Sequence, residues 1–269
     1  MKFTIFGSSG FIGTSLIQKL RSENIEFLAP DIRKDKITDQ NLGHVIYAIG
    51  NAGINFKQYP EKTIDANVIL LNKLLKEANF ESFLYLSSTR VYTNAKSTHE
   101  DSALIVNPSN HDNLYNISKI MGEAICNFSK KQNVRIARLS NVTGVNFNSE
   151  IFLPSIIQDA IKTKRIILQT KLNSEKDYVD IENVLDILLK ISQYGKKTIY
   201  NVASGKNLTN EKIVKKIQEI TKCELTITKD ARTNSFLPIS IKRIEEEFNF
   251  KPTSVLNKFK DIIDKYKKY

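Results

Sequence analysis

Three glycines near the start of the chain constrain its fold more than any other feature. They are Gly7, Gly10 and Gly13, and they follow a short apolar run from Lys2 to Phe6. Apolar residues then recur at helical spacing from Ile12 to Leu20. A buried strand that leads through a glycine turn into a helix is the setting in which a helix N-terminus binds a dinucleotide pyrophosphate. The sequence therefore predicts a parallel α/β sheet with a dinucleotide site at its first turn.

The three glycines have different expected roles in this turn. Gly7 permits the tight turn, Gly10 lets the backbone approach the pyrophosphate, and Gly13 lets the helix pack on the strand. The alternative is a glycine-rich turn that holds no ligand. The residues of the turn that we expect to contact the cofactor are Gly7, Ser9, Gly10, Phe11, Ile12 and Gly13.

A tyrosine and a lysine four residues apart form the second informative motif. Tyr115 and Lys119 fall within a pattern that predicts a helix from Asn113 to Ser129, so their side chains share one helix face. A neighbouring ammonium stabilises a phenolate and lowers the pKa of the phenol, which suits a group that exchanges protons. By itself this spacing is also typical of ordinary surface neighbours. Together with the glycine turn, it predicts a catalytic pair.

Composition excludes several classes of protein. The chain of 269 residues is 41% hydrophobic and 26% charged, as in soluble globular proteins. It has no apolar run near the roughly 18 residues that a membrane span needs, so we expect no membrane partner. A strand at the N-terminus leaves no place for a signal peptide, and Cys126 and Cys223 are far apart, which favours reduced thiols in a cytoplasmic protein. The three histidines are scattered, so we expect no metal site.

The net charge of +11 raises the question of a nucleic-acid partner. Lysines run throughout the chain, and this pattern indicates a compositional bias with solvated helix faces. We therefore expect no nucleic-acid partner. A basic surface would still attract anionic substrates.

In combination, these motifs resemble the extended short-chain dehydrogenase/reductases, and specifically their NAD-dependent epimerase/dehydratase family. Other segments similar to the family's motifs follow in order along nearly the whole chain. These segments are residues 25–31, 45–50, 83–92, 138–144, 176–184 and 200–205. The resemblance implies an α/β fold with a Rossmann-type doubly wound parallel sheet and a smaller α/β substrate-binding domain.

The resemblance also implies how the chain divides into domains and assembles. The family usually dimerises through the helices that correspond here to residues 63–78 and 113–129, so we expect a homodimer. The segment between Asp31 and Gly43 is shorter than in typical members. The expected domains are a dinucleotide-binding domain of residues 1–144 and about 176–202, and a small substrate-binding domain of about 145–175 and 203–269.

Catalytic and cofactor-binding roles follow from the same resemblance. Ser88, Tyr115 and Lys119 match the family's catalytic positions, with Ser88 preferred over its two hydroxyl-bearing neighbours. A plain strand-end hydroxyl is the alternative for Ser88. Besides Tyr115 and Lys119, cofactor contacts outside the glycine turn are implied for Asp31, Arg33, Ala48, Gly50 and Asn67.

The end of the second expected strand bears on which cofactor binds. Asp31 can bind the adenosine ribose hydroxyls and repel a 2′-phosphate, which favours NAD. Arg33 lies two residues later and could accept that phosphate, so NADP stays possible. A turn residue after Pro30 is the alternative for Asp31.

A last set of residues is expected to contact the substrate: Ser88, Thr89, Arg90, Asn141, Lys176 and Arg232. Lys176 stands where the family usually carries Arg, and it supplies charge without a bidentate fork. Thr89 and Arg90 stand where family dehydratases and decarboxylases tend to place acids. Elimination of water needs an acid at the leaving hydroxyl, and Arg cannot donate a proton near neutral pH. The sequence thus favours epimerisation or keto-reduction over dehydration.

The resemblance implies an NAD(P)-dependent epimerase or keto-reductase that acts on a nucleotide-linked sugar, with Tyr115 as the acid/base. Two alternatives stay open, namely a reductase of another small carbonyl compound and a regulator that senses the dinucleotide without turnover. The intact set of Ser88, Tyr115 and Lys119 argues against a pure sensor, which needs none of the three.

Overall fold

The computed structural model describes residues 1–32, 34–35, 40–50, 58–147, 149 and 151–268. The largest element of the protein is a six-stranded parallel sheet in the order β2-β1-β3-β4-β5-β9. Its strands are β1 (Lys2–Phe6), β2 (Glu26–Leu28), β3 (His44–Tyr47), β4 (Ser82–Ser88), β5 (Val134–Leu139) and β9 (Ile199–Val202). The chain runs from β1 out to β2 and returns to β3 on the other side of β1. Ligands bind at such a reversal of strand order, and the order confirms the predicted doubly wound sheet.

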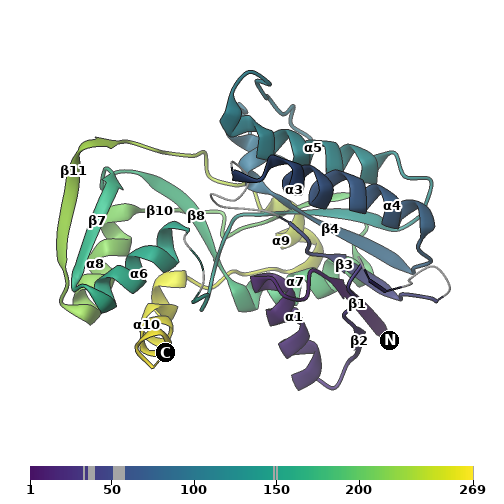
Figure 1. The fold of residues 1–269 in the computed structure, drawn as a ribbon, viewed down its shortest axis with the longest axis horizontal. Coiled ribbons are helices and arrows are strands. Elements are labelled where there is room, and N and C mark those ends of the chain that lie inside the picture. Colours follow the sequence, from purple (N-terminus) through teal and green to yellow (C-terminus); the bar gives the residue numbers. More distant parts are fainter. Residues whose placement is uncertain (33, 36–39, 51–57, 148, 150, 269) are drawn as a thin grey trace.

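Helices cover both faces of this sheet (Figure 1). The helices α1 (Phe11–Ser22) and α7 (Ile181–Tyr194) lie on one face, and α3 (Pro60–Ile64), α4 (Leu70–Glu77) and α5 (Leu114–Asn127) lie on the other. Side chains alternate along β4. Leu84 and Leu86 join the core under α1 and α7, whereas Phe83 and Tyr85 join the core under α4 and α5. Burial of both faces explains the continuous apolar runs of the strands.

A wider turn interrupts the helix that the sequence predicts over residues 63–78. The π-helical turn Asp65–Ile69 separates α3 from α4. It buries Asn67 completely, and the Nδ2 of this residue donates to the Ser118 hydroxyl on α5 (3.0 Å). The Tyr47 hydroxyl on β3 donates to a carbonyl of the same turn (2.5 Å). Partners far along the chain hold this turn, so the apolar stripe could not reveal it. Such turns are frequent at functional sites.

Two strands are shorter in the structure than in the prediction. The strand expected over residues 25–31 is reduced to the three residues of β2. The strand expected over residues 83–92 ends at Ser88, and Thr89–Tyr92 forms a 3₁₀ turn. The Ser88 hydroxyl accepts a hydrogen bond from the Arg90 amide (3.2 Å) and so caps this turn. Ser88 therefore lies at the carboxyl edge of the sheet.

A smaller lobe has its own core, at the left of Figure 1. The strands β6 (Asn141–Thr143), β8 (Glu175–Asp180) and β10 (Asn207–Thr209) form one sheet, and β7 (Arg165–Thr170) pairs with β11 (Glu224–Arg232). The helices are α6 (Phe152–Lys162), α8 (Asn210–Thr221) and α10 (Phe259–Lys267). A 3₁₀ turn, Val255–Lys258, leads directly into α10. In the described part of the chain, no helix is both long and apolar enough to cross a membrane.

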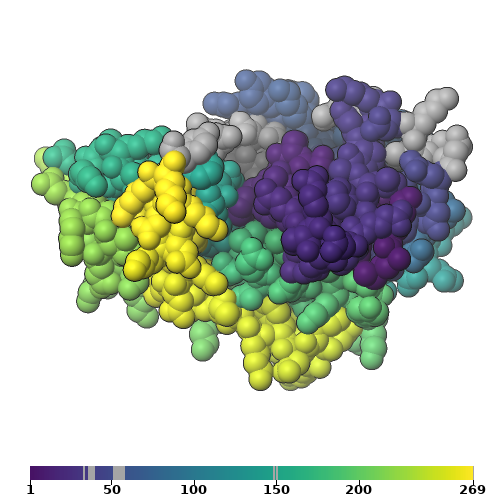
Figure 2. Space-filling view, turned by 90° about the horizontal axis from the view of Figure 1, so that it is seen from below, coloured from purple at the N-terminus to yellow at the C-terminus, as the bar shows by residue number. Residues whose placement is uncertain are grey.

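The C-terminal segment contacts both lobes. The helix α9 (Lys242–Phe248) brings Ile244 into the core under α1 and α7, whereas Val255 and Phe259 enter the core of the smaller lobe. Figure 2 shows this segment, in yellow, against both parts of the molecule. The expected division assigned all of residues 203–269 to the small domain. The packing instead joins the stretch around α9 to the large sheet.

Candidate active site

The glycine turn leaves no space for side chains. Gly7 has a φ of +87°, and a Cβ at this position would lie 2.7 Å from the carbonyl carbon of Ala48. A Cβ on Gly13 would lie 2.1 Å from the Gly7 carbonyl oxygen. Real Cβ atoms do not approach so closely, and φ near this value favours glycine. The turn therefore needs glycine at both positions to bring β1, β3 and α1 together.

The start of α1 is open to an anionic ligand. Gly10 is the N-cap residue, and among the described residues no side chain caps the helix and no acid lies in its first turn. The first amide groups of a helix lack partners within the helix and carry partial positive charge. Ser9 and Gly10 are exposed, and Phe11 and Ile12 are partly buried. These four residues of the predicted set are thus placed where a pyrophosphate could be held.

The structure brings the three predicted catalytic residues to the carboxyl edge of β4. The Ser88 side chain lies close enough to the Tyr115 hydroxyl to lower its pKa, and Tyr115 is 8% exposed. The Lys119 Nζ lies 6.0 Å from the centroid of the Tyr115 ring and 4.9 Å from that of Tyr85. It donates to the Leu86 carbonyl of β4 (2.9 Å). This contact fixes the ammonium beside the end of the strand.

Burial shifts the pKa values of Tyr115 and Lys119 in opposite directions, because it favours the neutral form of each side chain. Burial raises the pKa of Tyr115, while the Ser88 side chain and the charge of Arg90 lower it. Burial lowers the pKa of Lys119 to about 7, against the opposing charge of Glu123. From the sequence, Lys119 alone was expected to stabilise the phenolate. The structure adds Arg90, whose Cζ lies 5.3 Å from the centroid of the same ring.

Three of the predicted cofactor residues face one space. A Cβ on Gly50 would lie 3.6 Å from the Lys119 Nζ and 3.9 Å from the Asn67 Oδ1. This Oδ1 is buried and has no hydrogen-bond partner among the described residues. A buried carbonyl oxygen needs a donor, and a lysine ammonium needs an acceptor. A ligand with polar groups of both kinds, such as a dinucleotide with its ribose hydroxyls and carboxamide, fits this donor set.

A buried charge pair that the sequence analysis missed supports the helix of Tyr115 and Lys119. Glu123 lies one turn after Lys119, and the Arg138 guanidinium donates to its carboxylate from Nη2 (2.6 Å) and Nε (3.0 Å). The Ser87 hydroxyl also donates to Glu123 (2.5 Å), and Arg138 donates to the Tyr92 hydroxyl (2.6 Å). Ser87 is therefore engaged here, which supports the choice of Ser88. The signal available in the sequence was the spacing of four between Lys119 and Glu123.

Of the two residues predicted to lie near the adenosine end of the cofactor, the structure describes only Asp31. Asp31 follows β2, and its carboxylate lies 3.5 Å from the Lys34 ammonium. Its amide donates to the Asp35 carboxylate (2.7 Å). Arg33, the residue that would favour NADP, lies outside the described residues.

The predicted substrate contacts come from several elements. Asn141 opens β6, and its Nδ2 donates to the Asp177 carbonyl (2.7 Å), while Thr89 begins the 3₁₀ turn. The Lys176 Nζ lies 5.5 Å from the centroid of the Phe236 ring. Burial lowers the pKa of Lys176, and the charge of Arg90 lowers it further. The Lys176 ammonium is therefore close enough to Arg90 for their charges to repel. Arg232 ends β11 and is exposed, and its side chain is the least tied to the Tyr115 group.

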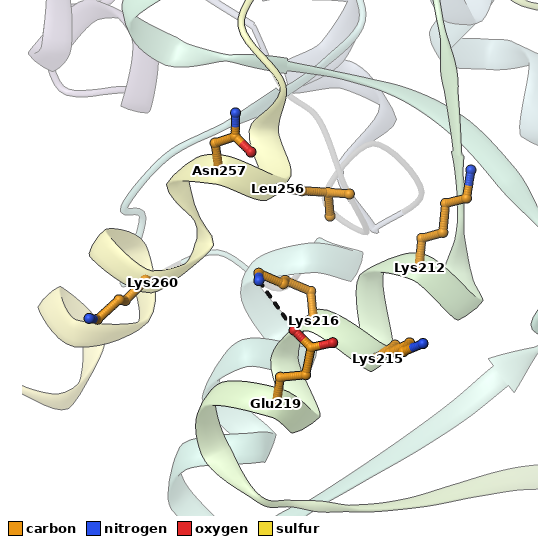
Figure 3. A pocket seen from close by; sticks show the side chains of 7 residues that line it. All are labelled: Lys212, Lys215, Lys216, Glu219, Leu256, Asn257 and Lys260. Carbon is orange, nitrogen blue, oxygen red and sulfur yellow. Dashed lines mark hydrogen bonds and ion pairs between the residues drawn. The ribbon is translucent and has the colours of Figure 1, made fainter.

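A cavity of about 580 Å³ lies elsewhere, between α8 and the C-terminal segment (Figure 3). It is lined by lysines, of which Lys216 is paired with Glu219 (3.2 Å). Lys212 and Lys260 extend away from one another, so the charges do not converge on a ligand. The described residues also contain no cluster of three or more His, Cys, Asp or Glu that could hold a metal ion.

Comparison with known proteins identifies the family of the chain. The sequence profile of the NAD dependent epimerase/dehydratase family matches residues 3–203, which is most of the chain. The chain belongs to this family. It is therefore an enzyme of the extended short-chain dehydrogenase/reductase type, as the motifs predicted. The prediction of NAD as the cofactor is confirmed at the level of the family.

Individual relatives of this family member are distant. A GDP-6-deoxy-D-talose 4-dehydrogenase from Aggregatibacter actinomycetemcomitans is 22% identical over 249 residues, 84% of the chain and 82% of the relative. A dTDP-4-dehydro-6-deoxyglucose reductase from Escherichia coli is 26% identical, over 97% of the chain and 95% of the relative. The solved structure of RMD from Pseudomonas aeruginosa complexed with NADPH superimposes with a TM-score of 0.82. It is 22% identical and covers 100% of the chain and 99% of that structure, which shows a shared fold.

Proposed function

We propose that this enzyme interconverts a hydroxyl and a keto group on a sugar that is linked to a nucleoside diphosphate, with Tyr115 as the acid/base. The observation that carries the proposal is the buried Tyr115 side chain, which lies beside Ser88 and has Arg90 and Lys119 near its ring. The curated relatives support the substrate class, because both names describe oxidation or reduction at position 4 of a nucleotide-linked 6-deoxy sugar.

The residues divide the proposed work between them. The glycine turn and the start of α1 would hold the dinucleotide phosphates, and Gly50, Asn67 and Lys119 would hold its nicotinamide end. When bound, the nicotinamide supplies the redox chemistry by exchanging a hydride with the sugar carbon. Ser88 would hold the sugar oxygen beside Tyr115. The Tyr115 hydroxyl would give the proton to a forming hydroxyl, or take it from a hydroxyl that becomes a ketone.

The turn after Ser88 disfavours dehydration. Thr89 and Arg90 begin the 3₁₀ turn next to Tyr115. A hydroxyl that leaves as water must be protonated, and neither a threonine hydroxyl nor a guanidinium does this near neutral pH. The proposed reaction therefore ends at the alcohol or the ketone, with the sugar's oxygens retained.

Reduction and epimerisation are both redox reactions at a sugar carbon, and we place reduction first because both curated relatives carry dehydrogenase or reductase names. Epimerisation is the second candidate because the family profile includes it. Consumption of cofactor separates the two. Reduction uses one equivalent of reduced cofactor per turnover, whereas an epimerase needs only catalytic amounts.

Tyr115→Phe tests the proposal. The purified enzyme is incubated with nucleotide sugars and their keto derivatives, and the absorbance of reduced cofactor and the product masses are followed. We expect Tyr115→Phe to lower turnover at least about 100-fold and to leave dinucleotide affinity near that of the wild type, since one hydroxyl is lost. Tyr194→Phe is the matched control and should keep full activity, because Tyr194 is the exposed last residue of α7.

Two outcomes would contradict the proposal. Undiminished turnover in Tyr115→Phe would remove the acid/base role, and loss of water from the sugar would remove the argument from Thr89 and Arg90. Binding of dinucleotide without turnover across the whole panel would favour the regulator that senses cofactor. Turnover of small carbonyl compounds other than nucleotide sugars, with no turnover of the sugars, would favour the alternative function of a reductase for such compounds.

We also propose that the enzyme works in a reducing compartment, as expected for the cytoplasm. Cys126 and Cys223 are both buried and free. Burial raises the pKa of the Cys126 thiol, which keeps it protonated and unreactive.

A further inference from the structure

Arg90 lies closer to the ring of Tyr115 than Lys119 does. Its Cζ is 5.3 Å from the ring centroid, whereas the Lys119 Nζ is 6.0 Å from it. A cation at this distance from an aromatic ring is attracted to it, and it is attracted more strongly when the ring carries a phenolate. The contact therefore favours the ionised form of Tyr115 over the neutral form.

The Arg90 side chain starts from a fixed backbone. The Arg90 amide donates to the Ser88 hydroxyl (3.2 Å), and the Arg90 carbonyl accepts from the Thr93 amide (3.0 Å) and hydroxyl (2.6 Å). At the other end, the Arg90 Nη2 donates to the Asp112 carbonyl (3.5 Å), at the turn before α5. The guanidinium thus spans from the end of β4 to the start of the helix that carries Tyr115.

The two cations near Tyr115 differ in how they hold their charge. Lys119 is buried, and its pKa is lowered to about 7, so near neutral pH its amine is only partly protonated. A guanidinium stays charged at any pH at which the protein is folded. Arg90 is also exposed, so water lowers its desolvation cost. It is the permanent cation of the pair.

We propose that Arg90 is a positioning residue for the proton chemistry of Tyr115: its guanidinium stabilises the phenolate, so Arg90 and Lys119 together set how readily this tyrosine exchanges a proton. The proposal rests on the proposed function only where it gives Tyr115 the acid/base role. It gives Arg90 a share in stabilising the phenolate, a role that the sequence motif predicts for Lys119 alone.

Other charged groups near Tyr115 enter the same balance. Lys119 lies on the same helix as Tyr115, and the ionisable phenol of Tyr85 on β4 interacts electrostatically with Tyr115. Lys176 on β8 is a further cation, close enough to Arg90 for the two charges to interact. Removing Arg90 leaves these side chains in place and raises the pKa of Lys176, which keeps a neighbouring cation and works against the expected change at Tyr115.

A direct titration of Tyr115 tests the proposal without any substrate. The full chain is labelled with ¹³C at the phenolic carbon of tyrosine, and the Tyr115 signal is assigned by its loss in Tyr115→Phe. The phenolate fraction is then compared at one alkaline pH at which circular dichroism shows every variant folded. We expect Arg90→Gln to raise the pKa of Tyr115 by about one unit, which is about a tenfold lower ratio of phenolate to phenol.

Two further variants separate charge from shape. Arg90→Lys keeps a cation and should retain most of the wild-type phenolate fraction. Arg21→Gln is the matched control, because Arg21 lies over the Phe27 ring with its Cζ at 5.9 Å from the centroid, far along the chain from Tyr115. It should leave the Tyr115 signal unchanged. An unchanged Tyr115 signal in Arg90→Gln would overturn the proposal.

Kinetics then connects the titration to catalysis. In Arg90→Gln, the limb of the kcat/KM profile that depends on Tyr115 should move to higher pH by the same amount as the titration, in either direction of the reaction. A higher KM with no movement of titration or limb would mean that Arg90 binds substrate and would refute the proposal. If Tyr115→Phe keeps its activity while Arg90→Gln still moves the titration, the proposed function fails and the electrostatic coupling stands.

Discussion

At the scale of single residues, the buried amine of Lys119 is the most unusual group in the protein. Its side chain is 4% exposed, and its pKa is lowered by burial to about 7 from an ordinary value of 10.5. The folded protein therefore binds this proton less tightly than the unfolded chain does. A protonated Lys119 opposes folding, and a ligand that accepts hydrogen bonds from it would relieve this penalty.

We predict that Lys119→Met loses activity and gains stability near neutral pH. Because the folded pKa is the lower one, the penalty is fully present below pH 7 and fades as the pH rises toward 10.5. The gain should be on the order of 2–4 kcal/mol at pH 7 and about 2 kcal/mol smaller at pH 9. Urea unfolding of the wild type and variant at both pH values measures it. The control is Lys242→Met at an exposed lysine, which should change stability by less than about 0.5 kcal/mol. A variant less stable than the wild type at pH 7 would contradict the argument.

Asp31 supports a second prediction at this scale. Its carboxylate is about half exposed beside Lys34, at the end of β2, where ribose hydroxyls could reach it. We expect NAD(H) to bind more tightly than NADP(H) by roughly 1–3 kcal/mol, through a charge-assisted bond and repulsion of a phosphate. Asp31→Ala should reduce this preference, while Glu26→Ala, at the other end of the strand, should not. Calorimetric titration of both cofactors decides the matter, and a wild type that prefers NADP(H) would disprove our interpretation of this strand end.

At the scale of elements, a buried ion pair joins the catalytic helix to the sheet. Glu123 on α5 accepts from Arg138 on β5 and from Ser87 on β4, the residue before Ser88. Both charged side chains are almost fully buried. One carboxylate thus fixes the helix of Tyr115 against the strand that carries Ser88. Its charge also raises the pKa of Lys119 and so keeps part of that amine protonated.

We predict that Glu123→Ala destabilises the protein by about 3–5 kcal/mol, because it leaves the Arg138 charge buried without a partner. The double variant Glu123→Leu with Arg138→Met should recover most of this loss, since it removes both charges. Glu246→Ala breaks the exposed pair with Lys242 (3.6 Å) and should cost less than about 1 kcal/mol. Urea unfolding of the set is the measurement. Equal effects of the buried and exposed changes would show that the network contributes little.

At the scale of the whole molecule, one face carries a set of exposed apolar side chains. Their residues belong to the helical segments α3 to α4 and to α5 with its C-terminal end, which cover one face of the sheet in Figure 1. Met121 lies within α5 and is 50% exposed, and Phe128, the residue after α5, is 88% exposed, although the opposite face of α5 is buried. Such a group favours contact with a second copy. The set consists of Ile64, Ile69, Met121 and Phe128.

We therefore expect a homodimer formed through α5 and the helical segment α3 to α4. Met121→Glu places a charge in this face and should shift the protein toward monomer by at least about tenfold in dissociation constant. Ile167→Glu, at an exposed apolar position of β7 in the smaller lobe, is the matched control. Analytical ultracentrifugation over a range of concentrations measures both. A wild type that stays monomeric throughout would exclude this interface.

The sequence alone determined the features that depend on local order. The glycine turn between an apolar strand and a helix specifies the start of the sheet, because Gly7 and Gly13 stand where no side chain fits. The spacing of Tyr115 and Lys119 on one helix follows from the helical repeat. The boundaries of β1 also follow from such a pattern, and the division into two lobes of unequal size follows from the family resemblance.

The tertiary structure decided which of these residues meet. Ser88 lies beside Tyr115 because β4 stops at the sheet edge and a 3₁₀ turn follows, although a strand was expected as far as Tyr92. The π turn that buries Asn67 against Ser118, and the pairing of Glu123 with Arg138, depend on which helices and strands become neighbours. These contacts join residues far apart in the chain. Local periodicity specifies the face on which a side chain lies, but only the packing of that face specifies its partner.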